Sequence, residues 1–257
     1  MAGWWLGLVV VALCVLGAGG CAEEGDAYLR RVQQAGVLRV GMDPSWPPFA
    51  FVDPGSGEIG GLDVDLARAI GDQLGVEVAL VPSGWEGLYS ALRAGQFDAI
   101  VSALPYDPWQ TQGVAYSTSY FNAGPVVVVH AGQAAIARPR DLAGRTVHVE
   151  FGSEGDVQAR RLRKKGGDMH IVPHATAQEA LAATEADAGS AAIVDAISAR
   201  LFMRAGGQLQ IVGDPLYDEL YVIAVHPRAR SLQEAIDQAL ADMRESGALE
   251  RLLDRWL

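Results

Sequence analysis

Acidic and aromatic side chains stand in the loops that follow several predicted strands of this chain. Carboxylates accept hydrogen bonds from ammonium groups, and aromatic rings offer a face to apolar or cationic groups. Ligands of open α/β sheets bind beyond the carboxyl ends of the strands, so the sequence predicts that these loops meet in one cleft. The loops contain Asp43, Trp46, Trp85, Ser102, Ala103, Pro105, Tyr106, Trp109, Gln110, Glu150, Phe151, Ser153 and Asp195. Taken one at a time, Trp46 and Trp85 are better explained as core aromatics, but the number of such residues at strand ends favours the cleft.

Two patterns that could hold a cofactor or a metal do not fit their surroundings. Residues 55–60 match the glycine pattern of a dinucleotide site, but a turn at 53–54 precedes them instead of a long buried strand. His170 and His174 have the spacing of zinc ligands on a helix, but Pro173 between them breaks a helix. The sequence also lacks the G-x-S-x-G nucleophile pattern. It therefore predicts no cofactor, no metal and no enzyme of a recognised class.

Short apolar stretches alternate with amphipathic ones, which is the pattern of strands joined by helices. Leu62, Leu66, Ile70 and Leu74 are spaced four apart, which places them on one face of a helix. Strands are predicted at residues 37–41, 49–52, 76–81, 98–103, 125–130, 146–150, 170–172 and 191–194. Helices are predicted at residues 62–74, 86–94, 156–165, 177–183 and 232–256, the last interrupted at Gly247. This order predicts an α/β fold with mainly parallel sheets.

The composition excludes several classes of protein. Half of the 257 residues are hydrophobic and 20% are charged, so the chain can bury a core and is not disordered. Its 20 basic and 31 acidic residues give a net charge of −11, which would repel a nucleic-acid backbone. No stretch after residue 21 holds about 18 consecutive apolar residues, so the sequence predicts no membrane span there.

The first charged residue is Glu23, and the uncharged stretch before it has the pattern of a secretory signal. Residues 4–18 are apolar or small, and residues 18–21 (Ala-Gly-Gly-Cys) resemble a bacterial lipobox, in which the cysteine is lipidated. The lipobox departs from the usual pattern at Ala18, and no Lys or Arg precedes the apolar run. We predict a signal peptide at 1–20 and lipidation of Cys21; the alternatives are an ordinary signal peptide cut near residue 20 or an uncleaved anchor. No cysteine follows Cys21, so a disulfide framework is excluded.

Several segments together resemble the bacterial extracellular solute-binding proteins of family 3, the polar amino-acid type of ABC transporter binding protein. The matching segments are residues 36–49, 61–67, 85–88, 92–98, 116–117 with 120–121, 141–147, 246–249 and 254–256. The resemblance covers residues 36–257 and implies a type II periplasmic-binding-protein fold with two lobes and a two-strand hinge. It implies a first lobe at 36–121 and 222–257, a second lobe with hinge strands at 122–221, and a lipid-anchored linker at 21–35. It also implies a monomer outside the cytoplasm that captures a small solute and passes it to an ABC importer.

The resemblance also implies roles for individual residues. Trp46 and Trp85 fall where two aromatic rings sandwich the side chain of the solute. Asp195 falls where an acid accepts the α-ammonium group, and Asp43 matches an acid of the first lobe. Ser102, Ala103 and Ser153 fall on loops that approach the solute, Ser153 at the carboxylate. Glu150 and Phe151 flank that second-lobe loop.

One element of the family pattern is missing. The usual Thr and Arg that grip the α-carboxylate are replaced by Pro105 and Gln110, and Gln110 brings no charge. The remaining candidates are acids and aromatics. We therefore expect a cationic or neutral polar solute, such as an amine, in place of an ordinary α-amino acid.

Two other functions are compatible with the same fold. A few relatives are dehydratases that act on prephenate-like substrates, but carboxylate substrates would be repelled by a cleft of acids without an arginine. A sensor domain is the other alternative; such domains are usually joined to a membrane span and a signalling domain, and neither follows in this sequence.

Overall fold

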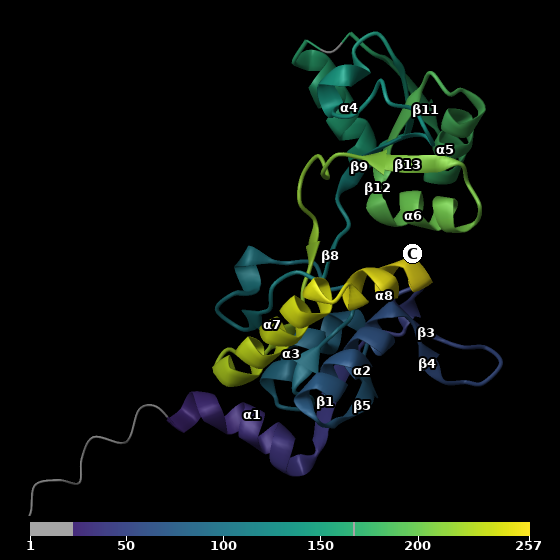
Figure 1. The fold of residues 1–257 in the computed structure, drawn as a ribbon. Coiled ribbons are helices and arrows are strands. Elements are labelled where there is room, and N and C mark those ends of the chain that lie inside the picture. Colours follow the sequence, from purple (N-terminus) through teal and green to yellow (C-terminus); the bar gives the residue numbers. More distant parts are fainter. Residues whose placement is uncertain (1–22, 167) are drawn as a thin grey trace, which may run out of the picture.

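The computed structural model describes residues 23–166 and 168–257. In this part of the chain, two five-stranded sheets form separate lobes that are joined by a pair of short strands (Figure 1). The predicted signal peptide at 1–20 and the predicted lipidation site Cys21 lie outside the described residues. Helices pack on both sheets, which confirms the predicted two-lobed α/β fold.

The sheet of the first lobe has the strand order β5-β1-β6-β15-β7. Its strands are β1 (Val37–Met42), β5 (Glu77–Pro82), β6 (Ala99–Ile100), β7 (Ala115–Tyr116) and β15 (Ala224–Val225). β1 runs parallel to β5 and β6, whereas β15 is antiparallel to β6 and β7. The carboxyl ends of β1, β5 and β6 therefore lie at one edge, from which the predicted cleft loops leave.

The helices of the first lobe include the best predicted element of the chain. They are α1 (Glu23–Ala35), α2 (Leu62–Leu74), α3 (Leu88–Arg93), α7 (Arg230–Glu245) and α8 (Ala248–Trp256). Of the apolar positions spaced four apart in α2, Leu62, Leu66 and Ile70 are buried and Leu74 is partly buried. The helix is followed by Gly75, whose φ of 69° is left-handed. The predicted interruption at Gly247 separates α7 from α8. The predicted helix at 86–94 begins instead as a 3-10 turn, η1 (Trp85–Gly87), before α3.

The N-terminal helix α1 corrects the prediction of a linker at 21–35. Glu23–Ala35 form this helix, which packs against α7, and Val32 is buried between α1 and the rest of the lobe. The helix is amphipathic, with Tyr28, Leu29 and Val32 packed on the core of the lobe. Many of its other residues are charged, and a short helix of this kind needs packing on a neighbouring element to be stable. The described part of the predicted linker is therefore a piece of the first lobe.

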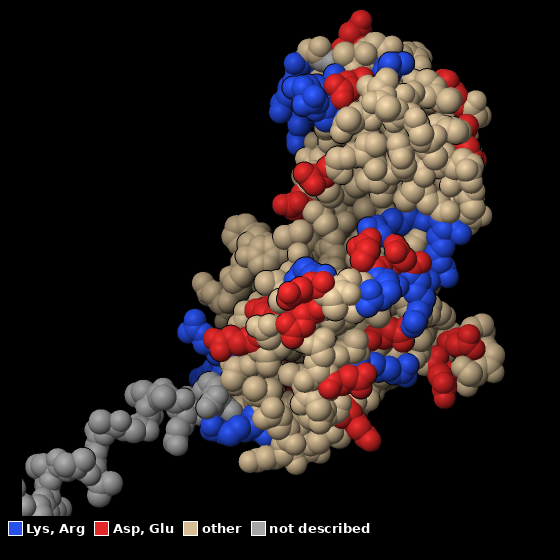
Figure 2. Space-filling model, viewed as in Figure 1, with Lys and Arg blue, Asp and Glu red and all other residues tan. Residues whose placement is uncertain are grey.

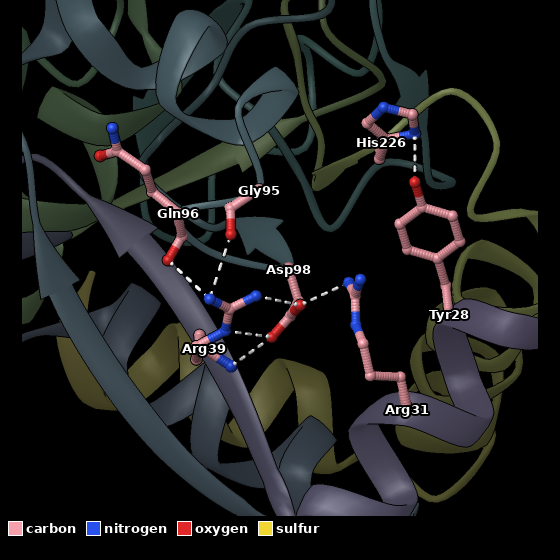
Figure 3. A network of polar contacts seen from close by, with 7 residues as sticks. All are labelled: Tyr28, Arg31, Arg39, Gly95, Gln96, Asp98 and His226. Atoms are coloured by element: carbon pink, nitrogen blue, oxygen red, sulfur yellow. Dashed lines mark hydrogen bonds and ion pairs between the residues drawn. The ribbon is translucent and has the colours of Figure 1, made fainter.

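Polar contacts also fix α1 to the first lobe (Figure 3). Arg31 pairs with Asp98 at 3.1 Å, and the Tyr28 hydroxyl lies 3.0 Å from Nδ1 of His226. The Asp98 carboxylate also accepts hydrogen bonds from the side chain and the backbone N–H of Arg39 on β1. Burial would raise the pKa of Asp98, but the hydrogen bonds from Arg39 and the charges of both arginines outweigh burial and lower it.

The second lobe has the strand order β11-β10-β12-β9-β13. Its strands are β9 (Pro125–His130), β10 (Thr146–Glu150), β11 (His170–His174), β12 (Ala191–Asp195) and β13 (Leu209–Val212). β10 is parallel to β11 and β12, and β9 is antiparallel to β12 and β13. Its helices are α4 (Glu154–Lys164), α5 (Ala177–Ala186) and α6 (Ala196–Arg204), of which α6 was not predicted. The carboxyl ends of β10 and β12 are neighbours, as in the first lobe.

Basic side chains gather at the far end of the second lobe, near α4 (Figure 2). The last turn of α4 carries Arg161, Arg163 and Lys164. Cations at a helix C-terminus interact favourably with the helix dipole, which accounts for this cluster.

Two short strands connect the lobes. β8 (Phe121–Asn122) pairs antiparallel with β14 (Leu220–Tyr221). The strands of the first sheet fall within 36–121 and 222–257, and those of the second within 122–221. Away from these strands, α6 of the second lobe faces α8 of the first (Figure 1), and Arg200 forms ion pairs with Glu250 at 3.0 Å and Asp254 at 3.5 Å.

A small antiparallel sheet follows β1 and consists of β2 (Ser45–Trp46), β3 (Ala50–Val52) and β4 (Ile59–Gly60). Residues 55–60, which match a dinucleotide pattern, form the turn between β3 and β4 and the start of β4. Two further 3-10 turns are η2 (Pro108–Gln110) and η3 (Pro139–Leu142). The predicted strand at 98–103 is limited to β6, because Ala103 turns the chain with a left-handed φ of 42°.

Candidate ligand cleft

Asp43 connects three loops at the edge of the first sheet. It follows β1, and its carboxylate accepts hydrogen bonds from the backbone N–H groups of Trp85 at 3.0 Å and Ser45 at 3.1 Å. Its own N–H donates to the Ser102 hydroxyl at 2.9 Å. The loops after β1, β5 and β6 are therefore held together, as the sheet topology requires of a ligand site.

The two tryptophans predicted to sandwich a solute are both exposed. Trp46 on β2 has 60% of its surface accessible, and Trp85 at the start of η1 has 45%. These values exclude the alternative that either ring is an ordinary core aromatic. Because Asp43 binds the backbone of Trp85 and of Ser45, the residue before Trp46, one carboxylate sets the position of both aromatic loops.

Ser102 and Ala103 form a buried loop behind these aromatics. The Ala103 N–H donates to Oδ2 of Asp63 at 2.6 Å, and the Tyr120 hydroxyl donates to Oδ1 of the same carboxylate at 2.8 Å. Asp63 is fully buried, and burial raises its pKa to about 7 despite these two hydrogen bonds. The sequence did not predict a role for Asp63, because a hydrogen bond to a loop 40 residues away has no local signal.

The turn that should grip a carboxylate in this family takes no part in that hydrogen-bond network. Pro105 pairs with Tyr221 of the hinge strand β14, and the next N–H, from Tyr106, donates to Leu220. Gln110 ends η2, and in the described residues its hydrogen bonds are those of its backbone. Trp109 beside it is 89% exposed. The structure thus places Pro105 at the hinge and Gln110 on an outer turn.

The second-lobe candidates lie where β10 meets α4. Glu150 ends β10, and its carbonyl accepts hydrogen bonds from both the N–H and the hydroxyl of Ser153. Ser153 caps α4, because its Oγ accepts the N–H of Asp156 at 3.2 Å. Phe151 between them is 72% exposed. Glu150, Phe151 and Ser153 are therefore brought together on one loop.

Asp195 occupies the same position on the neighbouring strand. It ends β12 and caps α6, with its Oδ1 accepting the Ser198 N–H at 2.8 Å. One carboxylate oxygen is used by the cap, which leaves the second oxygen available for a solute. Since β10 and β12 are adjacent and parallel, Asp195 lies at the same sheet edge as Glu150.

The predicted residues thus form two groups, one in each lobe. Within the described residues, no hydrogen bond or ion pair joins the first-lobe group to the second-lobe group. A cavity of about 420 Å³ does lie between the lobes, but its walls come from β8, β9, β13, α6, α7 and α8 and from residues next to these elements. None of the predicted ligand residues lines it, so this cavity is distinct from the predicted cleft.

The described residues contain neither a cluster of metal-binding side chains nor a membrane-spanning helix. In residues 23–166 and 168–257, no group of three or more His, Asp or Glu side chains could hold a metal ion. His170 and His174 lie on strand β11, where Nε2 of His174 is 2.9 Å from Nδ1 of His148. Over the same residues, no helix is both long enough and apolar enough to cross a membrane.

Two lobes joined by a pair of strands, with acids and aromatics at the strand ends of each lobe, define a type II periplasmic-binding-protein fold. Residues 38–257 match the bacterial extracellular solute-binding proteins, family 3, and the chain belongs to this family. The family is extracellular by description, which agrees with the predicted location outside the cytoplasm.

Relatives and solved structures agree with this assignment. The chain is 26% identical to an L-cystine-binding protein of Escherichia coli strain K12, over 98% of this chain and 93% of that protein. It is similar to an ancestral cationic amino acid solute-binding protein, with 27% identity, a TM-score of 0.63, and coverage of 89% of this chain and 98% of that one. An ancestral cyclohexadienyl dehydratase has a TM-score of 0.76 with 24% identity over 89% of this chain and 95% of that one, which shows the shared fold alone.

Proposed function

We propose that this chain captures a small polar or cationic solute, amino-acid-like or an amine, between its lobes and delivers it to an ABC importer. The observation that carries the proposal is the chemistry of the candidate cleft. The candidate residues supply three acids, Asp43, Glu150 and Asp195, and exposed aromatic rings, and none of them is a Lys or Arg. Such a site favours a cation and repels an anion.

The similar binding proteins support a solute with an ammonium group. Cystine and cationic amino acids, which their names specify, both carry one. In this chain Gln110 stands on an outer turn where the family resemblance implies an arginine for the carboxylate. A bidentate arginine contact would be lost, so a solute whose recognition depends on a carboxylate should bind weakly.

Calorimetric titration with four compounds tests the proposal: L-arginine, 1,4-diaminobutane, L-cystine and L-glutamate. We expect the diamine or L-arginine to bind most tightly and L-glutamate to show no measurable heat. Tighter binding of L-glutamate than of either cation would refute the proposed solute class.

The assignment of the site is tested with Asp195→Asn and Trp85→Ala. Each should weaken binding of the tightest compound at least tenfold without unfolding the chain, because each removes a direct contact. Asp168→Asn is the matched control. Asp168 is exposed near the amino end of β11, at the opposite edge of the same sheet, and its loss removes the same charge. Equal affinities of the Asp195→Asn and Asp168→Asn variants would show that Asp195 is not a ligand residue.

We propose further that the chain is not an enzyme, although a dehydratase shares its fold. Prephenate and arogenate carry carboxylates, and the candidate cleft offers three acids and no arginine to receive them. Incubation with each compound, followed by the absorbance of the aromatic product, should give the rate of the buffer alone. Turnover that Asp195→Asn abolishes would establish an enzyme instead.

We propose that the mature protein is a lipid-anchored monomer with Cys21 at its N-terminus. The sequence supports the lipid anchor, because residues 18–21 resemble a lipobox and Cys21 stands at the position that is lipidated in that pattern. Mass spectrometry of the N-terminal peptide should find a diacylglyceryl cysteine, and Cys21→Ala should release the protein from membranes. Size-exclusion chromatography with light scattering of the released protein tests the monomer.

A further inference from the structure

The first lobe contains an ionisable side chain that its core would not be expected to tolerate. Asp63 has no accessible surface, and the residues on either side of it, Leu62 and Val64, belong to the apolar core. In the described part of the chain, the hydrogen bonds of its carboxylate come from Tyr120 and from the Ala103 N–H, and neither donor is a cation. Burying an acid in such surroundings costs stability. This cost raises the question of what the position of Asp63 does for the rest of the lobe.

The backbone around Asp63 is built to hold it there. The Asp63 N–H donates to the Phe49 carbonyl at 2.9 Å, and α2 begins at the preceding residue. Gly61 before the helix has a φ of 130°, and a Cβ on it would lie 2.2 Å from the same Phe49 oxygen. Only glycine permits this close approach, which fixes the first turn of α2 and with it the Asp63 side chain.

One carboxylate oxygen leads to the ligand loops. The Ala103 N–H that binds Oδ2 belongs to a residue with a φ of 42°, a strained conformation for alanine that needs support from its surroundings. The adjacent Ser102 hydroxyl accepts the N–H of Asp43, and the Asp43 carboxylate holds the backbone of Trp85. A continuous path through bonded residues and hydrogen bonds therefore runs from Asp63 to the aromatic loops.

The other carboxylate oxygen leads to the hinge. The Tyr120 hydroxyl donates to Oδ1, and Tyr120 immediately precedes the hinge strand β8. The Tyr120 N–H in turn donates to the carbonyl of Tyr221 on β14, the second hinge strand, at 2.9 Å. Hydrogen bonds therefore connect both hinge strands, through Tyr120, to the carboxylate that also holds the ligand loops.

We propose that Asp63 is a positioning residue that couples the ligand loops of the first lobe to the hinge, and that this coupling requires the ionised carboxylate. The effect of this coupling on solute binding rests on the proposed function. The coupling between the loops and the hinge exists in the protein without solute and does not depend on that function. An ionised carboxylate accepts strong hydrogen bonds from both the Ala103 N–H and the Tyr120 hydroxyl. Protonation turns one carboxylate oxygen into a hydroxyl, which weakens one of these two hydrogen bonds.

The coupling is therefore sensitive to pH near neutrality. Burial raises the pKa of Asp63 to about 7, and the hydrogen bonds from Tyr120 and Ala103 oppose that rise. Two titratable groups of the described residues feel the charge of Asp63, Tyr120 before β8 and Tyr221 on β14, and burial together with neighbouring carboxylates raises the pKa of each above its ordinary value. Both tyrosines stay neutral when Asp63 titrates. Between pH 6 and pH 8, ionisation of Asp63 therefore strengthens its hydrogen bonds to Ala103 and Tyr120, and protonation weakens them.

Hydrogen exchange of the solute-free protein gives the first test. With the intrinsic effect of pH subtracted, the Ala103 amide should exchange roughly tenfold faster at pH 6 than at pH 8 in the parent, the effect of losing one hydrogen bond to a charged group. Asp63→Asn should show no such difference between the two pH values, because the asparagine side chain does not titrate. Slow, pH-independent exchange of Ala103 in both proteins would overturn the proposal.

A second variant separates positioning from mere folding. Tyr120→Phe keeps the ring and removes the hydroxyl that lowers the pKa of Asp63, so the midpoint of the Ala103 transition should move to higher pH. Tyr89→Phe is the matched control: it breaks a tyrosine hydroxyl contact of 2.8 Å, to Tyr116, in the same lobe but away from Asp63. The midpoint should be unchanged in this control, and equal midpoints in all three proteins would contradict the role of Asp63.

Binding of L-arginine or 1,4-diaminobutane, whichever the parent binds more tightly, gives the functional reading. Affinity should fall several-fold from pH 8 to pH 6 in the parent and should be low and independent of pH in Asp63→Asn. If the parent binds neither compound, the proposed function fails and the exchange experiment still decides the coupling. If the parent binds one of them with the same pH profile as Asp63→Asn, the coupling has no effect on binding and the proposal fails.

Discussion

The two halves of the candidate cleft are built in different ways. In the first lobe, the hydrogen bonds that hold the site join residues far apart in sequence: 42 residues separate Asp43 from Trp85, 59 separate it from Ser102, and 40 separate Asp63 from Ala103. In the second lobe, Ser153 and Asp195 bind partners three residues away, as helix caps.

The difference teaches where each half-site gets its geometry. A cap forms as soon as its helix forms, so the second-lobe residues are positioned by local structure. The first-lobe loops are positioned only when the whole sheet and α2 are assembled around Asp43 and Asp63. Substitutions in the first lobe should therefore act over longer distances and with larger effects than substitutions in the second.

The largest effect on stability is expected for Asp98→Ala, which removes contacts between distant residues of the first lobe. The carboxylate is buried and accepts hydrogen bonds from the side chains of Arg39 and Arg31 and from the Arg39 backbone N–H. Its removal loses these charged hydrogen bonds and should lower the free energy of unfolding by about 3 kcal/mol. Chemical denaturation measures this. Asp53→Ala in the same lobe is the control, because Asp53 is exposed and binds only the local turn at residues 55 and 56; it should cost much less.

The pH dependence of Asp98 has a definite sign. Its pKa is lowered in the folded chain, so its contribution to stability is present above the ordinary pKa of 3.8 and is lost as the pH falls below that value. Asp98→Ala should therefore lose less stability than the parent between pH 5 and pH 3. A parallel loss in both proteins would show that Asp98 is not the group concerned.

The largest effect on binding is expected for Asp43→Ala. The change removes an acid from the site and also releases the backbone of Trp85 and Ser45, so both aromatic loops lose their support. Affinity for the preferred cation should fall about 30-fold, or about 2 kcal/mol, measured by calorimetry. A loss smaller than that caused by the next substitution would reverse the comparison of the lobes.

Asp195→Ser should have a smaller effect on binding and almost none on stability. Serine is as good a cap as aspartate, so α6 keeps its N-terminal hydrogen bond while the site loses a charge. We expect about a tenfold loss of affinity with the free energy of unfolding unchanged within about 0.5 kcal/mol. A large fall in stability would mean that Asp195 has structural contacts besides the cap.

The same contrast explains how much could be predicted from the sequence. Local signals gave α2 with its bounds, the break at Gly247 and the strands β9 and β10, because apolar spacing and glycines act within a few residues. Trp46 and Trp85 are exposed and the candidate residues group by lobe, whereas their part in binding a solute stays a prediction.

What could not be predicted depends on contacts between distant segments. The helix α1 gains its stability from packing on α7 and from Asp98, neither of which is visible in its own sequence. The roles of Asp63 and of Asp43 as a connector need the folded sheet, and Gln110 could not be placed on an outer turn before the path of the chain after β6 was known.

Ser153→Ala tests the half-site of the second lobe, where we expect a smaller loss of stability than for Asp98→Ala. The change removes the cap of α4 and the hydroxyl bond to Glu150, and should lower the free energy of unfolding by about 1 kcal/mol. Ser153→Thr, which keeps an oxygen at the cap, should recover most of this loss in chemical denaturation. Failure of the threonine variant to recover stability would show that packing, and not the cap, matters at this position.

The smallest effect is expected where the two lobes meet away from the cleft. Figure 2 shows acidic and basic side chains together where α6 faces α8, and Arg200 accounts for two ion pairs there. If solute binding closes the lobes about the hinge, α6 must move relative to α8, and these partly exposed pairs would then favour the arrangement of the lobes in this structure. Arg200→Gln should therefore raise affinity for the preferred cation about twofold, since exposed pairs contribute about 0.5 kcal/mol. The gain should vanish in 1 M salt, which screens the pairs in the parent as well.

Arg255→Gln is the control for this prediction. It removes a comparable ion pair, with Asp65, that lies within the first lobe, and it should leave affinity unchanged. A gain of the same size in both variants would mean that lost surface charge, and not the contact between the lobes, sets the affinity.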